Sequence, residues 1–166
     1  PDMLDAQYEG RLRGYTYARE GHPNADALAR LIDDLEGAQD GIVLGSGMAA
    51  VSAALLGVLE AGDHIIGSDQ LYGRSLRLLK EDLPRLGIDT SLVDTTQADC
   101  VVAARRPNTK MILIEAVSNP TLRVADLTGI AAWTAEKQVI LAVDNTFTTP
   151  KAIRPFDFGA DIAVSY

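Results

Sequence analysis

The sequence has 166 residues, of which 47% are hydrophobic and 23% are charged, and its formal net charge is −8. These values fit one ordinary globular domain with a sizeable buried core, and they exclude disordered, collagen-like and coiled-coil chains. The acidic balance and the absence of a basic patch predict no nucleic-acid partner, because phosphate backbones would be repelled.

The cysteine and histidine content is low. The single cysteine, Cys100, excludes an internal disulfide and a zinc site built from paired cysteines. His22 and His64 have no metal-like partners in the sequence, so we expect both to be structural and expect no metal site. One unpaired cysteine predicts a cytoplasmic location. No apolar run reaches the roughly 18 residues of a membrane span and the start lacks a signal-peptide core, so no membrane partner is expected.

Segments in which apolar residues recur at helical spacing alternate along the chain with short apolar runs that are typical of strands. Strands that are continuous apolar runs, such as 139–143, are typical of a parallel sheet covered on both faces by helices. The sequence therefore predicts an α/β fold, a three-layer sandwich with a mostly parallel sheet. After an arm over residues 1–23, we expect helices over 24–36, 47–60, 75–86, 97–105 and 127–137, and strands over 41–44, 64–68, 88–93, 111–116, 139–144 and 161–164.

In such a sheet the ligand binds outside the carboxyl ends of the strands, so residues just after strands are functional candidates. The segment Gly45–Ala50 follows a predicted strand and opens a helix, where free N–H groups suit a phosphate. A small-residue turn that packs the helix on the sheet is the alternative. Asp144 closes another strand, and its carboxylate needs a cationic partner such as a protonated heterocyclic nitrogen, or else caps local N–H groups.

Three further segments have both a ligand-binding and a plainer interpretation. Tyr72 could stack its ring on a planar cofactor or be half-buried packing. Asn119 could offer its amide to a ligand, although Asn-Pro is also a turn former. Tyr17 lies beside Arg19, an arrangement that can clamp a phosphate. The alternative for this last segment, which runs from Tyr15 to Pro23, is an arm docked on the surface.

Nine short sequence motifs are distributed along nearly the whole chain. They are Tyr17-Ala18-Arg19, Gly21-His22-Pro23, Leu35-Glu36-Gly37, Ser46-Gly47-Met48-Ala49-Ala50, Gly62-Asp63-His64-Ile65, Leu71-Tyr72-Gly73, Ser118-Asn119-Pro120-Thr121, Val143-Asp144-Asn145-Thr146-Phe147 and Gly159-Ala160-Asp161-Ile162. In this order they resemble the trans-sulfuration family of pyridoxal-phosphate enzymes, which includes cystathionine γ-synthase, cystathionine lyases, methionine γ-lyase and the acylhomoserine sulfhydrylases.

The resemblance implies the large domain of a fold-type I pyridoxal-phosphate enzyme over residues 24–166, incomplete and without its C-terminal domain. It implies that the backbone N–H groups of Gly47 and Met48 hold the phosphate of pyridoxal 5'-phosphate. Tyr72 would stack on the ring and relay protons, as the catalytic residue of this chain. Asp144 would pair with the ring N–H⁺ and keep it protonated.

Three expectations concern the rest of the site and the assembly. Thr146 would support the region of the ring nitrogen, and Asn119 would lie near the ring hydroxyl and the carboxylate of an amino-acid substrate. Tyr17 and Arg19, on the arm, would reach the phosphate of a neighbouring subunit. The resemblance therefore implies a homo-oligomer, commonly a dimer of dimers.

The implied activity is β- or γ-elimination, or γ-replacement, on sulfur-containing amino acids or activated homoserine. The Schiff-base lysine is expected about three residues beyond Tyr166. Ser165 stands where the family usually has histidine, and Arg74 replaces the usual small residue or cysteine near the substrate site. The alternative is a truncated, catalytically inactive chain of the same fold that acts only as a binding or structural partner.

Overall fold

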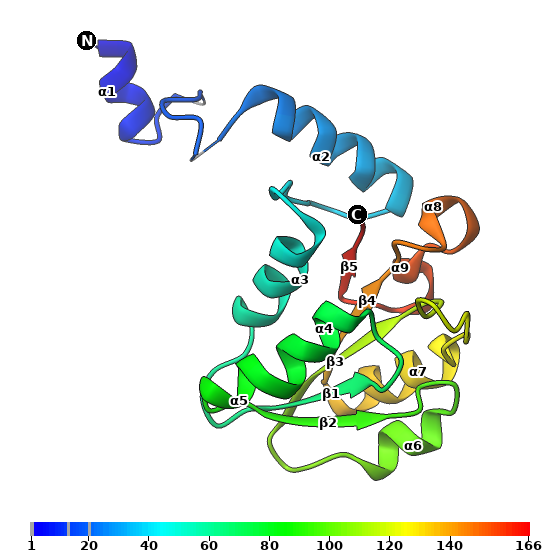
Figure 1. Ribbon diagram of the computed structural model, residues 1–166. Coiled ribbons are helices and arrows are strands. Elements are labelled where there is room, and N and C mark those ends of the chain that lie inside the picture. Colours follow the sequence, from blue (N-terminus) through cyan, green and yellow to red (C-terminus); the bar gives the residue numbers. More distant parts are fainter. Residues whose placement is uncertain (1, 13, 20) are drawn as a thin grey trace. The chain divides into compact units, whose positions relative to one another are not determined.

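The computed structural model describes residues 2–12, 14–19 and 21–166, and the chain divides into two compact units (Figure 1). One unit extends to Val43 and the other is Leu44–Tyr166. Glu20, in the segment between Tyr15 and Pro23, lies outside the described residues. The predicted division into an arm over 1–23 and a domain over 24–166 remains a prediction.

The first unit contains the helices α1 (Asp2–Tyr8) and α2 (Pro23–Glu36). The sequence predicted α2 and its ends. The His22 side chain accepts a hydrogen bond from the backbone N–H of Asn24 at the start of the helix. Gly37 ends α2 in the left-handed conformation, with φ of 74°, which glycine adopts without strain. His22 therefore has the structural role that the sequence predicted.

The apolar stripe of α2 is solvent-exposed within the described residues. The exposed fractions of Leu28, Leu31 and Leu35 are 45%, 58% and 51%. The strand predicted over 41–44 does not form, and Ile42 is 78% exposed. An extended apolar segment becomes a strand only where a neighbour offers a hydrogen-bonding edge. Among the described residues none pairs with this segment, so that prediction was wrong.

In the second unit, five strands of the described residues form one parallel sheet in the order β2-β1-β3-β4-β5. The strands are β1 (His64–Ser68), β2 (Asp89–Val93), β3 (Thr109–Glu115), β4 (Ile140–Asp144) and β5 (Ile162–Val164). The helices are α3 (Gly47–Leu56), α4 (Gly73–Arg77), η1 (Leu78–Asp82), α5 (Leu83–Arg85), α6 (Ala98–Ala103), α7 (Leu127–Lys137), α8 (Thr149–Ala152) and α9 (Pro155–Phe158).

Both faces of the sheet are covered. On the central strand β3, Ile112 and Ile114 pack in the apolar cluster that includes residues of α6 and α7. The alternate residues Met111 and Leu113 pack in a second cluster with residues of α3, η1 and α5. This arrangement is the three-layer α/β sandwich with a parallel sheet that the sequence predicted.

The helix predicted over 75–86 is built as α4, η1 and α5, with a π-helical segment in the middle. It packs closely on β1 at Gly67, where a Cβ atom would lie 2.2 Å from Cδ2 of Leu79. The helix predicted over 47–60 ends at Leu56, and the short helices α8 and α9 were not predicted. Helices of four residues leave too few positions for a periodic pattern.

The two-sided burial of β3 has a direct test. Ile112→Ala and Leu113→Ala, which open cavities on opposite faces, should each lower the free energy of unfolding by about 2–5 kcal/mol. Lys110→Ala, on an exposed position of the same strand, should change it by less than about 0.5 kcal/mol. Urea unfolding of the three variants provides the measurement. A large loss in only one of the two core variants would contradict a sheet covered on both faces.

His64, at the start of β1, is fully buried and has a partner for each ring nitrogen. Its Nδ1 lies 2.8 Å from Oγ1 of Thr109, and its Nε2 lies 2.9 Å from Oγ of Ser91. Burial lowers the pKa of His64 below its ordinary value of 6.5, and the nearby Arg106 lowers it further, while Asp89 raises it. The residue is structural, as predicted.

This depressed pKa predicts a stability that falls with acidification. The unfolded chain binds a proton at His64 more readily than the folded chain, so the free energy of unfolding should decrease as the pH falls below about 6.5. Urea unfolding between about pH 7.5 and about pH 5 should show a shallower loss for His64→Gln, which does not titrate, than for the wild type. Equal pH dependence of the two proteins would show that His64 does not contribute.

Candidate functional site

The carboxyl ends of β3 and β4 lie beside the start of α3 at a cavity of about 460 Å³ in the second unit. The cavity is lined by Ser46, Gly47, Met48, Val51, Tyr72, Ser75, Glu115, Val117, Asn119, Asp144, Thr146, Phe147 and Tyr166. Residues that the sequence singled out separately therefore share one cavity: Gly47, Met48, Tyr72, Asn119, Asp144 and Thr146.

One end of the cavity is formed by the N-terminus of α3. Ser46 begins the helix, and its Oγ accepts the N–H of Ala49 at 3.1 Å. The backbone N–H groups of Gly47 and Met48 have no hydrogen-bond partner among the described residues. Free N–H groups and the positive end of the helix dipole favour an anion at this place.

Gly47 also permits a close contact that the sequence did not reveal. A Cβ atom at this position would lie 2.8 Å from Cβ and Cγ of Tyr166. Tyr166 therefore contributes to the wall of the cavity beside the start of α3. Any larger residue at position 47 would have to displace this tyrosine.

Asp144 ends β4 and contributes a carboxylate to the cavity. Its Oδ1 accepts the backbone N–H of Thr146 at 3.0 Å. Among the described residues none donates a hydrogen bond to Oδ2. Asp144 therefore combines both interpretations made from the sequence: one oxygen caps a local N–H group and the other is available to a cationic donor.

Glu115, at the end of β3, is a cavity residue that the sequence analysis missed. It is the register partner of Asp144 on the adjacent strand and is 7% exposed. Its two carboxylate oxygens accept the backbone N–H groups of Tyr72 and Asn119. The pKa of Glu115 is raised above its ordinary value, mainly by burial and further by the neighbouring Asp144. The two backbone hydrogen bonds partly oppose this shift by lowering the pKa. The signal for Glu115 was a carboxylate at the end of an apolar strand, as for Asp144.

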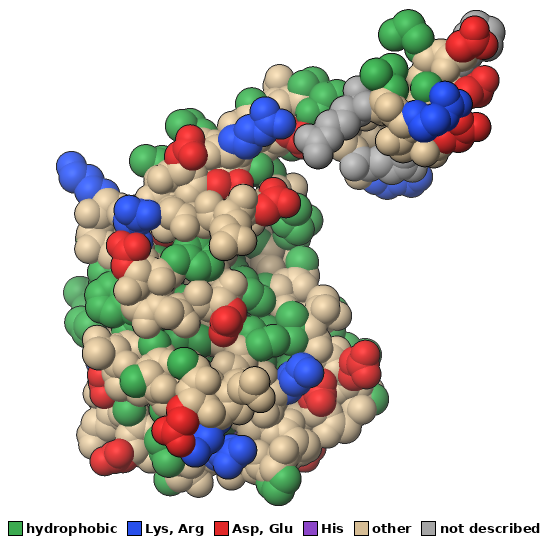
Figure 2. Space-filling model, turned by 180° about the vertical axis from the view of Figure 1, so that it is seen from behind, with side chains coloured by type: hydrophobic (Ala, Val, Ile, Leu, Met, Phe, Trp, Pro, Cys, Tyr) green, Lys and Arg blue, Asp and Glu red, His purple; other side chains and the backbone are tan. Residues whose placement is uncertain are grey.

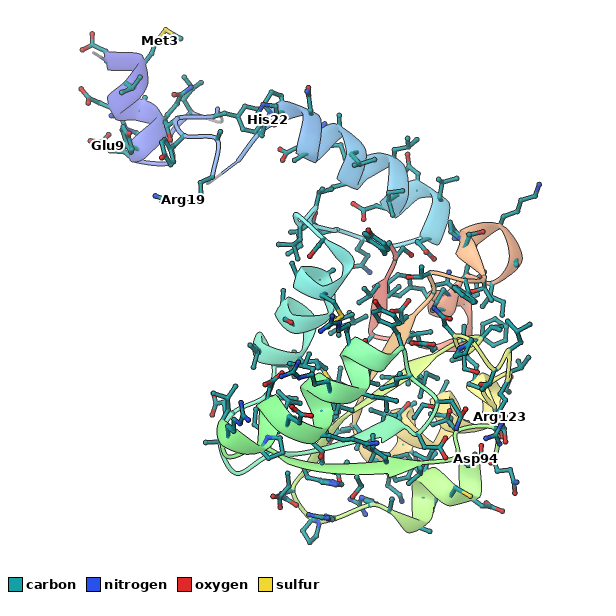
Figure 3. All side chains as sticks on the ribbon, viewed as in Figure 1. Met3, Glu9, Arg19, His22, Asp94 and Arg123 are labelled. Carbon is teal, nitrogen blue, oxygen red and sulfur yellow. The ribbon has the colours of Figure 1, made fainter. Side chains whose placement is uncertain are left out.

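The connection that carries Asn119 is fastened at its far end by an ion pair. Nη2 of Arg123 lies 2.5 Å from Oδ2 of Asp94, and the two side chains point toward each other in Figure 3. Hydrogen bonds from Thr96 lower the pKa of Asp94, and Arg123 lowers it further. The backbone N–H of Arg123 also donates to Oγ of Ser118 at 2.9 Å.

Tyr17 and Arg19 belong to the first unit and are not among the lining residues of the cavity. Cζ of Arg19 lies 4.9 Å from the centre of the Tyr17 ring, a cation–π distance. Arg19, labelled in Figure 3, is exposed, as is Tyr17. Their predicted contact with a neighbouring subunit's phosphate remains a prediction.

Three further observations on the described residues concern other classes of site. Acidic and basic side chains are interspersed over the face of the second unit in Figure 2. Among the described residues, no three His, Cys, Asp or Glu side chains are grouped as metal ligands. None of the described helices is both long and apolar enough to span a membrane.

Residues 2–165 match the family described as Cys/Met metabolism PLP-dependent enzymes. The chain belongs to this family. It is 41% identical to cystathionine gamma-lyase from Bacillus subtilis over 155 residues, which cover 93% of this chain and 41% of that protein. It is 36% identical to L-methionine gamma-lyase from Porphyromonas gingivalis, covering 95% of this chain and 40% of that protein. The chain thus spans less than half the length of these relatives.

Solved structures agree with this assignment. A Campylobacter jejuni protein that carries N'-pyridoxyl-lysine-5'-monophosphate superposes with a TM-score of 0.92 at 31% identity, covering 99% of this chain and 41% of that chain. O-acetylhomoserine sulfhydrylase from Wolinella succinogenes superposes with a TM-score of 0.82 at 37% identity, covering 86% and 42%. The fold is therefore that of the large domain of fold-type I pyridoxal-phosphate enzymes, as predicted.

The cavity fits the cofactor of this family. Pyridoxal 5'-phosphate is an aromatic ring with an anionic phosphate at one end and a basic ring nitrogen. The free N–H groups of Gly47 and Met48 suit the phosphate, and the available oxygen of Asp144 suits the protonated nitrogen. Tyr72, which is 46% exposed and lines the cavity, offers a ring face to stack on.

Proposed function

We propose that the protein performs pyridoxal-phosphate-dependent β- or γ-elimination, or γ-replacement, on sulfur-containing amino acids or activated homoserine. The observation that carries this proposal is the shared cavity. Residues predicted to bind the phosphate, the ring and the ring nitrogen come from separate segments of the chain and line one space. Membership of the Cys/Met metabolism family and the names of the relatives support the proposed substrate class.

The proposed roles follow from the chemistry of each side chain. When bound, pyridoxal phosphate supplies a protonated ring that withdraws electrons from the substrate carbon that loses its proton. Asp144 holds the proton on the ring nitrogen, and Thr146 orients Asp144 through its backbone N–H. The N–H groups of Gly47 and Met48 hold the phosphate at the start of α3.

Two further side chains act nearer the substrate. Tyr72 stacks on the ring, and its phenol group is the candidate for moving a proton to or from the substrate. Asn119 offers its side-chain amide to the ring hydroxyl and the substrate carboxylate. Both residues line the cavity and are fixed to Glu115 through their backbones.

We also propose a cytoplasmic homo-oligomer, a dimer of dimers, in which Tyr17 and Arg19 reach the phosphate of a neighbouring subunit. The exposed pairing of Arg19 with Tyr17 supports this role, because a stacked guanidinium retains its N–H donors for a phosphate. The single cysteine, Cys100, and the metabolic role of the family support the location.

The role of Asp144 is tested with pyridoxine 5'-phosphate, which has no aldehyde and binds without a covalent bond. Calorimetric titration of the 166-residue chain should show binding, and Asp144→Asn should weaken it by about tenfold to a hundredfold. Asparagine keeps an oxygen for the N–H of Thr146 but loses the charge that stabilises the ring N–H⁺.

The matched control is Asp161→Asn. Asp161 also accepts a backbone N–H, that of Leu141 at 2.8 Å, but it immediately precedes β5 and does not line the cavity. This variant should bind the ligand as tightly as the wild type does. Unchanged affinity in Asp144→Asn, or equal losses in the two variants, would refute the assigned role of Asp144.

The phosphate position is tested at Ser46. Ser46→Asp retains an acceptor that caps α3 but places a carboxylate beside the N–H groups of Gly47 and Met48. It should weaken pyridoxine 5'-phosphate binding by more than about tenfold, while the affinity for pyridoxine, which lacks the phosphate, should change little.

Ser46→Ala provides the comparison. It removes the cap and should lower the free energy of unfolding by about 1 kcal/mol, with a much smaller effect on ligand affinity than that of Ser46→Asp. If Ser46→Asp weakens the phosphorylated and unphosphorylated ligands equally, the phosphate does not bind at the start of α3.

A further inference from the structure

Glu115 connects two segments that are distant in the sequence. Tyr72 lies between β1 and α4, and Asn119 lies on the connection that follows β3. Oε1 of Glu115 accepts the N–H of Tyr72, and Oε2 accepts the N–H of Asn119 at 2.9 Å. One side chain thus fixes the backbones of the two residues that carry a ring and an amide into the cavity.

The two N–H groups donate to different oxygens of Glu115, which a carboxylate can accept at the same time. A glutamine in the same position would present an oxygen to one N–H group and a donor NH₂ group to the other. An aspartate is one methylene shorter, so it cannot occupy the same position between the two donors. The length and the two acceptors of glutamate both match the geometry observed at position 115.

Burying this carboxylate is unfavourable for folding alone. Glu115 is 7% exposed, forms no ion pair with a described residue, and lies beside a second carboxylate on the adjacent strand, Asp144. An apolar side chain at the end of β3 would avoid this desolvation cost but would leave the N–H groups of Tyr72 and Asn119 without their acceptor. What glutamate provides in return for its buried charge is a shared anchor for these two backbones.

We propose that Glu115 is a positioning residue of the pyridoxal-phosphate site, whose two carboxylate oxygens hold the backbones of Tyr72 and Asn119 so that both side chains reach the same bound ring. This inference rests on the proposed function. The connection that carries Asn119 is held at two places. The ion pair of Arg123 with Asp94 holds its far end, and the hydrogen bond from the N–H of Asn119 to Glu115 holds the end nearer the cavity.

The test uses Glu115→Gln and Glu115→Asp in the 166-residue chain, with Asp161→Asn as the control that also removes a carboxylate bound to a backbone N–H. Amide hydrogen exchange, measured by NMR, reports the two backbone contacts directly. Exchange at Tyr72, at Asn119 or at both should accelerate by about tenfold or more in each Glu115 variant, and should be unchanged in Asp161→Asn.

Affinity for pyridoxine 5'-phosphate provides the second readout. Both Glu115 variants should bind about tenfold more weakly than the wild type. In a Tyr72→Ala background the loss caused by Glu115→Gln should be clearly smaller, because part of its effect is transmitted through Tyr72. A loss of overall stability would instead act equally in both backgrounds, and Asp161→Asn should show no such coupling.

Each outcome is decisive. Wild-type affinity in Glu115→Gln, unchanged exchange at both amides, or full additivity with Tyr72→Ala would overturn the positioning role while leaving the proposed function intact. Wild-type affinity in Glu115→Asp would show that the charge alone matters, and would also overturn it. If the wild-type chain does not bind pyridoxine 5'-phosphate, the proposed function fails and the positioning role fails with it.

Discussion

The parallel direction of β1, β3 and β4 is the constraint on which the site depends. Parallel strands all end at the same edge of a sheet, so the segments that follow them are brought together. Glu115 and Asp144 end the neighbouring strands β3 and β4 in register. Tyr72 lies shortly after the end of β1, and Asn119 lies shortly after the end of β3. Apolar clusters on both faces of the sheet hold the strands in this arrangement.

The cavity is electrostatically divided, and this division matches the cofactor. The start of α3 presents the positive end of a helix dipole and N–H groups that have no partner in the described part of the chain. The ends of β3 and β4 present two carboxylates, Glu115 and Asp144. A ligand with an anionic phosphate at one end and a protonated nitrogen in its ring satisfies both. Neither feature alone selects this ligand, because isolated helix starts and isolated strand-end carboxylates are common.

The sequence predicted most of the second unit because its strands are continuous apolar runs and its turns are marked by glycine and proline. The same reasoning placed Asp144 correctly at a strand end, but it passed over Glu115, which was counted as the interior of a strand predicted to end at Ala116. Contacts between distant segments, such as Tyr166 with Gly47, have no local signature. The strand predicted over 41–44 failed because strand formation depends on a partner, which a local pattern does not specify.

The most direct test of this account is the protonation state of the bound ring. Pyridoxine 5'-phosphate labelled with ¹⁵N in its ring should show, when bound to the chain, the ¹⁵N chemical shift of a protonated nitrogen at pH values where the free ligand has lost that proton. Asp144→Asn should abolish this difference. A bound ring nitrogen that titrates as it does in free solution, or that is unaffected by Asp144→Asn, would contradict the assignment of the cavity.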